Sequence, residues 1–269
     1  MSRVAAIQMA SGPNVGANLI EADRLISRAV DAGAELVVLP ENFAHMGVSE
    51  QEKLKFAEDE GSGKIQDFLK EKSQKLGVWI VGGTLPMKCQ DPNKVRAACL
   101  VIDNKGKQVA RYDKIHLFDV AVPDAEESYA ESTAIEPGSE TVVIDTPIGK
   151  MGVAVCYDLR FPELFRQMHD QGVEVFAVPS AFTAITGRAH WEIIVRARAV
   201  ENLSFVVAAA QGGYHVSGRE THGDSMIVDP WGNVLDRLQR GSGFVIAELD
   251  LKRLKSIRRN FPVLEHRKL

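Results

Sequence analysis

The sequence predicts an α/β protein in which two sheets stack face to face between outer helices, a four-layer α-β-β-α sandwich. Two observations predict this class: strand-like apolar runs alternate with helical patterns, and the second half of the chain repeats the first. The apolar runs lack a regular polar alternation, which is typical of sheets covered on both faces. We expect residues 1–269 to form a single domain.

The first half alternates strands and helices and ends in a hairpin. Glycines follow both helical patterns, and glycine readily takes the left-handed conformation found at helix ends. The expected elements are a strand at 4–10, a helix at 16–31, a strand at 35–39, a helix at 63–76, a strand at 78–82 and hairpin strands at 95–102 and 108–112. Residues 113–141 lack periodicity, and so long a loop in a compact domain is usually functional.

The second half follows the same order. Its expected elements are a strand at 151–155, a helix at 162–171, a strand at 174–178, a helix at 189–202, a strand at 205–210, hairpin strands at 225–228 and 234–238, a strand at 243–249 and a helix at 252–260. Residues 33–43 align without gaps onto 172–182, and Gly, Glu, Pro and Phe coincide. A second gapless match joins the two hairpin turns, so we infer two pseudo-repeated halves.

Composition excludes several classes of function. The net charge of −4 gives no basic surface for nucleic acid or an anionic membrane. No apolar run approaches the roughly 20 residues of a membrane span, and the N-terminus lacks the core of a signal peptide. The cysteines, Cys89, Cys99 and Cys156, are three in number and so do not form a disulfide framework. A reducing, cytoplasmic location is therefore expected.

Three polar residues are expected at the same edge of the two sheets. Glu41 and Cys156 each follow a predicted strand, and Lys114 follows the first hairpin. A glutamate beside a cysteine is a suitable general base, and a lysine shielded from water can stabilise an oxyanion. Cys156 also precedes a predicted helix at Pro162, whose N-terminus would favour the thiolate. The alternative is that Cys156 is simply a small buried apolar residue.

A metal site built on Cys156 is a second alternative. The histidines that would complete it are His116, His190, His215 and His222. No pair of these residues has the spacing of zinc ligands, so we do not expect a metal site.

Five motifs carry a resemblance to a known family. They are LPENF at 39–43, YDKIHLF at 112–118, VCYDLRFPE at 155–163, GRAHW at 187–191 and DPWG at 229–232. Together and in this order they resemble the carbon–nitrogen hydrolase (nitrilase) superfamily along essentially the whole chain. The resemblance implies the sandwich fold inferred above and no cofactor. It also implies a homodimer or a larger homo-oligomer, with helix 189–202 and the C-terminal tail as candidate interfaces.

The resemblance also implies a thiol amidase. It assigns Cys156 as nucleophile, Glu41 as general base and acid, and Lys114 with the backbone N–H of Tyr157 as oxyanion donors. The family's second glutamate maps onto Glu131. Three neighbouring glutamates leave that last assignment open: Glu126, Glu127 and Glu136.

Within the superfamily, the chain is most similar to the deaminated glutathione amidases, on residues 179–187, 206–211 and 258–267. This likeness implies cleavage of an amide of 2-oxoglutarate to give 2-oxoglutarate and Cys-Gly. Two alternatives of the same chemistry stay open, an omega-amidase acting on 2-oxoglutaramate and an N-carbamoyl amidohydrolase. A non-catalytic protein that binds small molecules on the same scaffold is the alternative of another class.

A small amide substrate that carries carboxylates needs cationic side chains in its pocket. Arg160, Arg188 and Arg219 are the candidates by their position near the motifs, and Phe182 is a candidate apolar wall. Competing structural roles stay open: Arg160 could brace Asp158, Arg219 could be solvated, and Phe182 could pack in the core.

Overall fold

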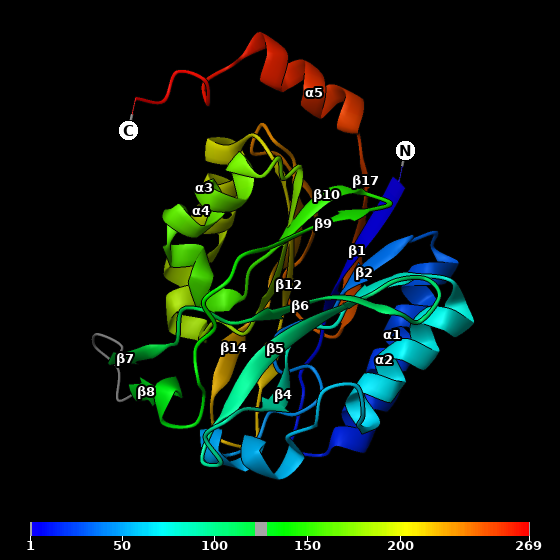
Figure 1. Ribbon diagram of the computed structural model, residues 1–269, viewed down its shortest axis with the longest axis vertical. Coiled ribbons are helices and arrows are strands. Elements are labelled where there is room, and N and C mark those ends of the chain that lie inside the picture. Colours follow the sequence, from blue (N-terminus) through cyan, green and yellow to red (C-terminus); the bar gives the residue numbers. More distant parts are fainter. Residues whose placement is uncertain (1, 122–127, 269) are drawn as a thin grey trace.

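The computed structural model describes residues 2–121 and 128–268 and places two large β-sheets face to face (Figure 1). One sheet has the order β17-β1-β2-β3-β5-β4, with β6 paired to β5. Its strands are β1 (Ser2–Gln8), β2 (Leu36–Val38), β3 (Trp79–Val81), β4 (Leu85–Lys88), β5 (Val95–Ile102), β6 (Gln108–Asp113) and β17 (Gly243–Leu249).

The other large sheet has the order β16-β15-β12-β11-β10-β9. Its strands are β9 (Val142–Thr146), β10 (Gly149–Val153), β11 (Val175–Ser180), β12 (Phe205–Ala210), β15 (Ser225–Val228) and β16 (Val234–Leu238). Two small ribbons pair β7 (Asp119–Ala121) with β8 (Ser128–Ala130), and β13 (Gly212–Tyr214) with β14 (Glu220–His222).

Helices cover the outer face of each sheet, which confirms the predicted four-layer sandwich (Figure 1). The helices are α1 (Val15–Asp31) and α2 (Lys64–Leu76) on the first sheet, α3 (Pro162–Asp170) and α4 (Ala184–Asn202) on the second, and α5 (Leu251–Asn260) near the C-terminus. Short 3-10 turns, η1 (Glu50–Phe56), η2 (Glu131–Thr133) and η3 (Cys156–Arg160), lie in the connections.

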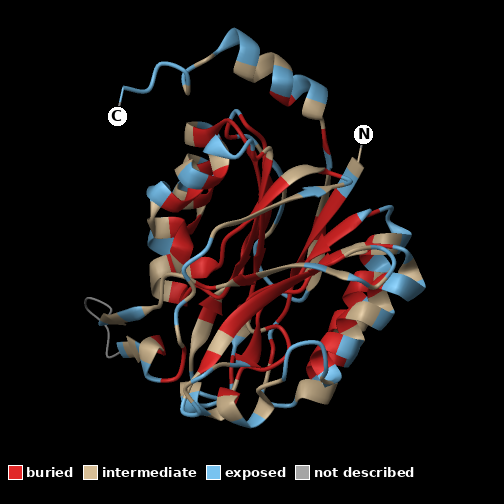
Figure 2. Cartoon of the chain, viewed as in Figure 1, coloured by how far each residue is buried: buried red, intermediate tan, exposed pale blue. Residues whose placement is uncertain are grey.

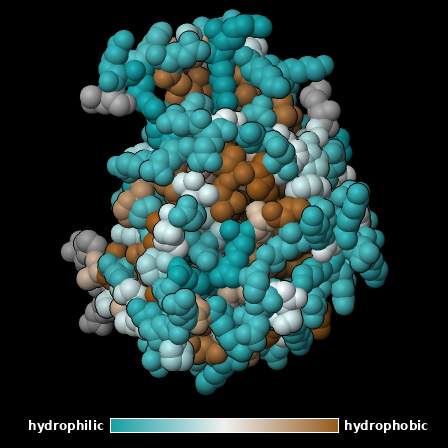
Figure 3. Space-filling model, viewed as in Figure 1, coloured by the Kyte–Doolittle hydropathy of each residue, from teal (hydrophilic) through white to brown (hydrophobic). Residues whose placement is uncertain are grey.

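The strands are apolar on both faces because each face meets another layer. In β1, Val4 and Ala6 face the core that includes the second sheet, whereas Ala5 and Ile7 join the core that includes α1. Most strand residues of the two sheets are accordingly buried, and most exposed residues lie on the outer sides of the helices, in loops and on strands at the sheet margins (Figure 2). The viewed surface is mostly hydrophilic, with apolar side chains gathered near β9 and β10 and below α5 (Figure 3).

The predicted repeat is present in the topology, and the two halves exchange strands. The series β1-β2-β3-β5-β6 corresponds to β10-β11-β12-β15-β16. The strand that follows the first series, β9, pairs antiparallel with β10, and the strand that follows the second, β17, pairs antiparallel with β1. Each sheet therefore contains one strand from the other half, which fixes the two sheets relative to each other.

Several elements differ from the sequence prediction. Helix α4 begins at Ala184 rather than 189, because the Thr183 hydroxyl accepts a hydrogen bond from Thr186 N and caps the helix there. Gly187 lies inside this helix, where an added Cβ would collide with the His222 side chain. Strands β4 and β9, the ribbon β13–β14 and the turn η1 were not predicted, and the loop at 113–141 contains β7, β8 and η2.

Candidate active site

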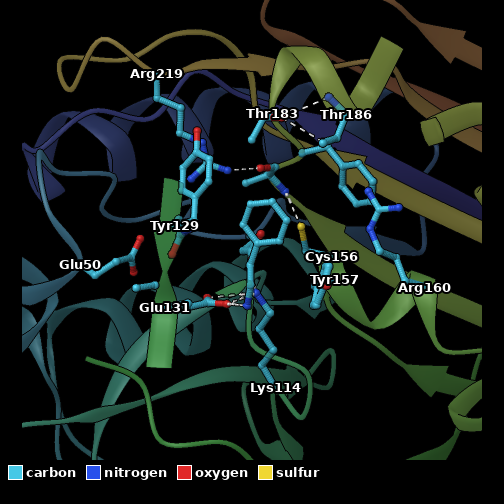
Figure 4. Close-up of a pocket in the computed structure, with 16 residues that line it drawn as sticks. Glu50, Lys114, Tyr129, Glu131, Cys156, Tyr157, Arg160, Thr183, Thr186 and Arg219 are labelled. Atoms are coloured by element: carbon cyan, nitrogen blue, oxygen red, sulfur yellow. Dashed lines mark hydrogen bonds and ion pairs between the residues drawn. The ribbon is translucent and has the colours of Figure 1, made fainter. Parts of the chain in front are cut away.

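Glu41, Lys114 and Cys156 meet at one edge of the two sheets, as the sequence predicted. Glu41 follows β2, Lys114 follows β6 directly, and Cys156 begins η3 just after β10. The Lys114 ammonium nitrogen lies 2.8 Å from a carboxylate oxygen of Glu41. The Cys156 sulfur accepts a hydrogen bond from the backbone N–H of Ala181 at 3.4 Å. Figure 4 shows the lysine and the thiol directed into the same cavity.

Glu131 completes this cluster from η2. Its two carboxylate oxygens lie 3.0 and 2.8 Å from the Lys114 nitrogen, and one also accepts the Phe118 N–H at 2.8 Å. Glu136 lies elsewhere and pairs with Arg96. Glu126 and Glu127 fall outside the described residues. Among the described candidates for the family's second glutamate, Glu131 is therefore the one in contact with Lys114.

The buried charges shift one another's pKa values. Lys114 is only 2% exposed, and burial alone would lower its pKa, but Glu131 and Glu41 outweigh burial and hold the pKa well above its ordinary value. Burial likewise acts to raise the pKa of Glu131, whereas Lys114, Lys53 and the Phe118 N–H bring it below the ordinary value. The lysine is therefore a permanent cation and Glu131 a permanent carboxylate near neutral pH.

Cys156 precedes a helix as predicted, but its surroundings oppose the predicted thiolate. Cys156 begins η3, a turn of five residues, and α3 starts at Pro162, where the sequence predicted a helix. Burial and the nearby Glu41 charge raise the pKa of the Cys156 thiol well above its ordinary value, although Lys114 and the Ala181 N–H act in the opposite direction. The surroundings of the resting site therefore favour the neutral thiol over the thiolate.

The loops that carry Glu41 and Cys156 each contain a residue in the left-handed backbone conformation. Cys156 has φ of +48° and Asn42, next to Glu41, has φ of +57°. Left-handed conformations cost a residue other than glycine about 1–3 kcal/mol, so the surroundings must hold them in place. The Asn42 N–H donates to the Thr84 hydroxyl at 2.8 Å. The Val155 N–H, just before the cysteine, donates to Asp158 at 2.8 Å.

Asp158 links the loop of the cysteine to the loop of the lysine. It is fully buried, and besides Val155 it accepts hydrogen bonds from the Tyr112 hydroxyl at 2.6 Å and the His116 backbone N–H at 3.1 Å. The His116 ring also contacts the Asp158 carboxylate, at 2.7 Å. Tyr112 and His116 flank Lys114 on either side. The spacing of these residues within the two motifs could have revealed this link, but the sequence analysis did not assign it.

The active-site cavity is lined by two of the three candidate arginines. Arg160 does not brace Asp158. Its guanidinium instead lies 5.8 Å from the centre of the Tyr157 ring and 5.5 Å from that of Phe182. Arg219 donates to the Ala181 carbonyl oxygen and lies 4.9 Å from the Tyr129 ring centre. Both arginines line the cavity.

Phe182 has both of the roles considered for it. It packs edge-on against Trp191, with ring centres 5.0 Å apart, and it also lines the cavity. Arg188, in contrast, lies outside the site. Its position on α4 makes it line a separate cavity with His222 and Asp224, so we correct its assignment as a substrate-binding residue.

Sequence reasoning missed other residues that line the cavity. These are Asn42, Glu50, Phe118, Tyr129, Ala130, Ala181, Thr183 and Thr186. The internal repeat was a signal for some of them, because it aligns Ala181 with Asn42, and both follow equivalent strands.

The histidines considered for a metal site are engaged elsewhere. His116 bonds to Asp158, and His215 bonds to Ser11 and Thr221. Within residues 2–121 and 128–268, no three His, Cys, Asp or Glu side chains are grouped so that they could hold a metal ion. Within the same ranges, no helix has the length and apolar character needed to cross a bilayer.

A family comparison supplies the context for this geometry. The family model of the carbon–nitrogen hydrolases matches residues 3–259. The chain belongs to the carbon–nitrogen hydrolase family. It is therefore a hydrolase that acts on carbon–nitrogen bonds, and its relatives support amidohydrolase chemistry.

Relatives of this hydrolase include curated enzymes and solved structures. A "Deaminated glutathione amidase" of Synechocystis is 44% identical over 98% of this chain and 97% of its own. The crystal structure of the C. elegans NitFhit protein superposes with a TM-score of 0.93 at 37% sequence identity. The superposition covers 99% of this chain and 65% of the NitFhit chain. Saccharomyces cerevisiae Nit3, a member of the nitrilase superfamily, superposes with a TM-score of 0.87 at 31% identity, covering 97% of this chain and 94% of its own.

Substitution of Asp158 should test the link between the two loops. Asp158→Ala is expected to lower the free energy of unfolding by about 3 kcal/mol or more, because it leaves several buried donors without an acceptor. Tyr112→Phe removes a single donor and should cost about 1–2 kcal/mol. Urea unfolding of both variants measures the difference, and equal losses would contradict a central role for Asp158.

Substitution of Glu131 should change how stability depends on pH. Because the Glu131 pKa is lowered in the folded protein, its charge stabilises the fold above the ordinary glutamate value of about 4.3. That contribution is lost as the pH falls through the lower, folded pKa. Glu131→Gln should therefore be less stable than the wild type at about pH 7, and the gap should narrow at about pH 3.5.

Urea unfolding across this range is the measurement for Glu131. The control is Glu136→Gln, which removes the partly exposed pair with Arg96 and should change stability by less than about 1 kcal/mol. A gap between the wild type and Glu131→Gln that stays constant with pH would contradict the assignment.

Proposed function

We propose that the protein is an amidase of deaminated glutathione, which it cleaves to 2-oxoglutarate and Cys-Gly through a thioester on Cys156. The observation that carries this proposal is the contact of Lys114 with Glu41 and Glu131 beside the buried thiol. The name of the Synechocystis relative supports the choice of substrate.

In the first half of the reaction, Glu41 accepts the proton of the Cys156 thiol as the sulfur attacks the amide carbonyl carbon. The carbonyl oxygen becomes an oxyanion, which Lys114 and the backbone N–H of Tyr157 stabilise. Protonated Glu41 then gives its proton to the amide nitrogen as the carbon–nitrogen bond breaks. The amine leaves, and the acyl group stays on sulfur as a thioester.

In the second half, Glu41 accepts a proton from water as the water oxygen attacks the thioester carbon. The carbon–sulfur bond breaks, 2-oxoglutarate leaves, and the sulfur recovers its proton from Glu41. The raised pKa of the Cys156 thiol suits this sequence, because it favours return of the proton to sulfur at the end of the reaction.

Glu131 acts through Lys114 in this proposal. Two carboxylates on one ammonium hold the lysine side chain in a single position, with 2.8 Å contacts to both partners. Such preorganisation lets the charge of the Lys114 ammonium stabilise the oxyanion without rearrangement.

Arg160 and Arg219 are assigned to the carboxylates of the substrate, since charge-assisted pairs with arginine are strong and directional. Phe182 forms an apolar wall beside Arg160.

Kinetics on a panel of amides is the test of this function. The wild type should release 2-oxoglutarate from deaminated glutathione with a higher kcat/KM than from 2-oxoglutaramate, and should release little ammonia from N-carbamoyl amino acids. Cys156→Ser should abolish turnover, and Lys114→Met should lower kcat about 100- to 1,000-fold through loss of an oxyanion donor. Cys89→Ser, outside the cavity, is the control and should retain activity.

The outcomes distinguish the alternatives. Equal or faster cleavage of 2-oxoglutaramate would indicate an omega-amidase, and faster cleavage of N-carbamoyl compounds an N-carbamoyl amidohydrolase. Binding of these compounds without turnover by the wild type would indicate a non-catalytic binding protein and overturn the proposal.

The whole chain, residues 1–269, is proposed to act as one carbon–nitrogen hydrolase domain in the cytoplasm. The reciprocal pairing of β9 with β10 and of β17 with β1 supports a single folding unit. The free state of all three cysteines supports a reducing compartment.

A homodimer or larger homo-oligomer is proposed through α4 and the C-terminal segment. Exposed apolar side chains in and beside these segments support it: Val200 of α4 is 47% exposed and Phe261, after α5, is 49% exposed. Trp231, between β15 and β16, is 54% exposed and contacts Phe261 edge-on. Sedimentation velocity should find a dimer or larger species for the wild type and a monomer for Trp231→Glu. A monomeric wild type would contradict this interface, and circular dichroism controls for folding.

A further inference from the structure

A wider hollow adjoins the active-site cavity. We call it the outer groove; it is lined by residues 42, 46–50, 53, 128–130 and 217–219. The residues that line both spaces are Asn42, Glu50, Tyr129, Ala130 and Arg219. The cavity and the outer groove are therefore neighbours, and these shared residues lie between them.

The two sides of the thiol differ in their surroundings. Arg160, Phe182 and Thr183 line the cavity but not the outer groove. In Figure 4, Arg160 lies on one side of Cys156, whereas Arg219, Tyr129 and Glu50 lie on the other. An amide bound at the sulfur therefore has an enclosed side near Arg160 and an open side toward the groove.

The proposed chemistry decides which part of the substrate occupies each side. The leaving nitrogen must lie near Glu41, because that residue supplies its proton. Asn42, the next residue in the chain, lines the outer groove. The acyl group stays bonded to Cys156 and has no need of an exit until the thioester is cleaved. The leaving amine accordingly extends into the groove, and the acyl group occupies the enclosed side.

The outer groove presents an arginine for which the described residues offer no acidic partner. Lys53 is buried and pairs with Glu50 at 2.6 Å. For Arg219, no carboxylate of the described residues lies within 4.0 Å, and its side chain contacts the Ala181 carbonyl oxygen and the Tyr129 ring. Its Nε–H is buried without an acceptor among the described residues. A carboxylate at this point would form a charge-assisted pair with this guanidinium.

We propose that the outer groove is the subsite for the leaving amine, that it takes a short peptide ending in a carboxylate, and that Arg219 binds this carboxylate. The inference rests on the proposed function and adds the direction in which the substrate lies. A dipeptide spans at most about 7 Å, so its carboxylate stays within about that distance of the scissile nitrogen. Arg219 is the arginine on that side, since it lines both the cavity and the outer groove. Arg160 is left to serve the carboxylate of the acyl group.

A matched pair of substrates tests this assignment. Both are amides between the distal carboxyl of 2-oxoglutarate and alanylglycine, and they differ only in ending as a carboxylate or as a carboxamide. The readout is the ratio of their kcat/KM values for the wild type, Arg219→Gln, Arg219→Lys and Arg160→Gln. Because both substrates share the acyl group and the scissile bond, the ratio isolates recognition of the terminal carboxylate.

The wild type should prefer the carboxylate by about 10- to 100-fold, and Arg219→Gln should bring the ratio close to about one. Arg219→Lys should keep part of the preference, which also controls for misfolding of the glutamine variant. Arg160→Gln should lower kcat/KM for both substrates and keep the ratio, because it acts on the shared acyl group.

Other results would overturn the inference. A wild-type ratio near one, a ratio that survives Arg219→Gln, or a ratio lost in Arg160→Gln instead would each overturn the assignment of Arg219 and leave the amidase activity standing. Cleavage of neither amide by the wild type would overturn the proposed function, and this inference with it.

Discussion

A buried ammonium held between two carboxylates is the interaction on which the site depends. Lys114 contacts Glu41 and Glu131 at 2.8 Å, and all three are less than a tenth exposed. Charges in such surroundings are stable only when paired, so removing one partner leaves an uncompensated charge in the interior. The same arrangement governs Cys156, whose pKa is raised by burial and by the Glu41 charge. The thiol is therefore kept neutral beside its base, and the cation is already in place for the negative charge that develops on the amide oxygen.

The fold supplies this cluster from segments that are far apart in the chain. Each residue follows a strand, and the stacking of the two sheets brings those strand ends to one edge (Figure 1). The exchange of β9 and β17 between the halves prevents the sheets from moving independently. Asp158 adds a local constraint, because it bonds to the segments on both sides of Lys114 and to the residue before Cys156. Because Lys114 is already held in place, the site needs no reorganisation during the reaction. Such preorganisation is the main source of electrostatic catalysis.

Most of the repeated elements could be predicted because their apolar periodicity is strong and the two halves agree. The exceptions have local causes. Strands β4 and β9 are short strands at sheet edges, each paired with a single neighbour, and their few residues give a weak pattern. The start of α4 was placed late because its capping residue, Thr183, stands within a segment that also reads as loop, and Gly187 weakens the helical pattern. In the site, motif proximity placed Arg160 and Arg219 in the cavity, but the same reasoning failed for Arg188, whose place on the first turns of α4 makes it line another cavity.

The sequence by itself determined the fold class, the internal repeat and the meeting of Glu41, Lys114 and Cys156, because periodicity and strand ends are local properties of the chain. The tertiary structure alone decided the direction of the pKa shift of the Cys156 thiol, the partners of Asp158 and the position of the outer groove beside the cavity. These properties depend on burial and on distances between segments separated by many residues, and neither is written in local sequence patterns. The sequence thus named the reacting groups, and packing determined their electrostatic state and the space left for a substrate.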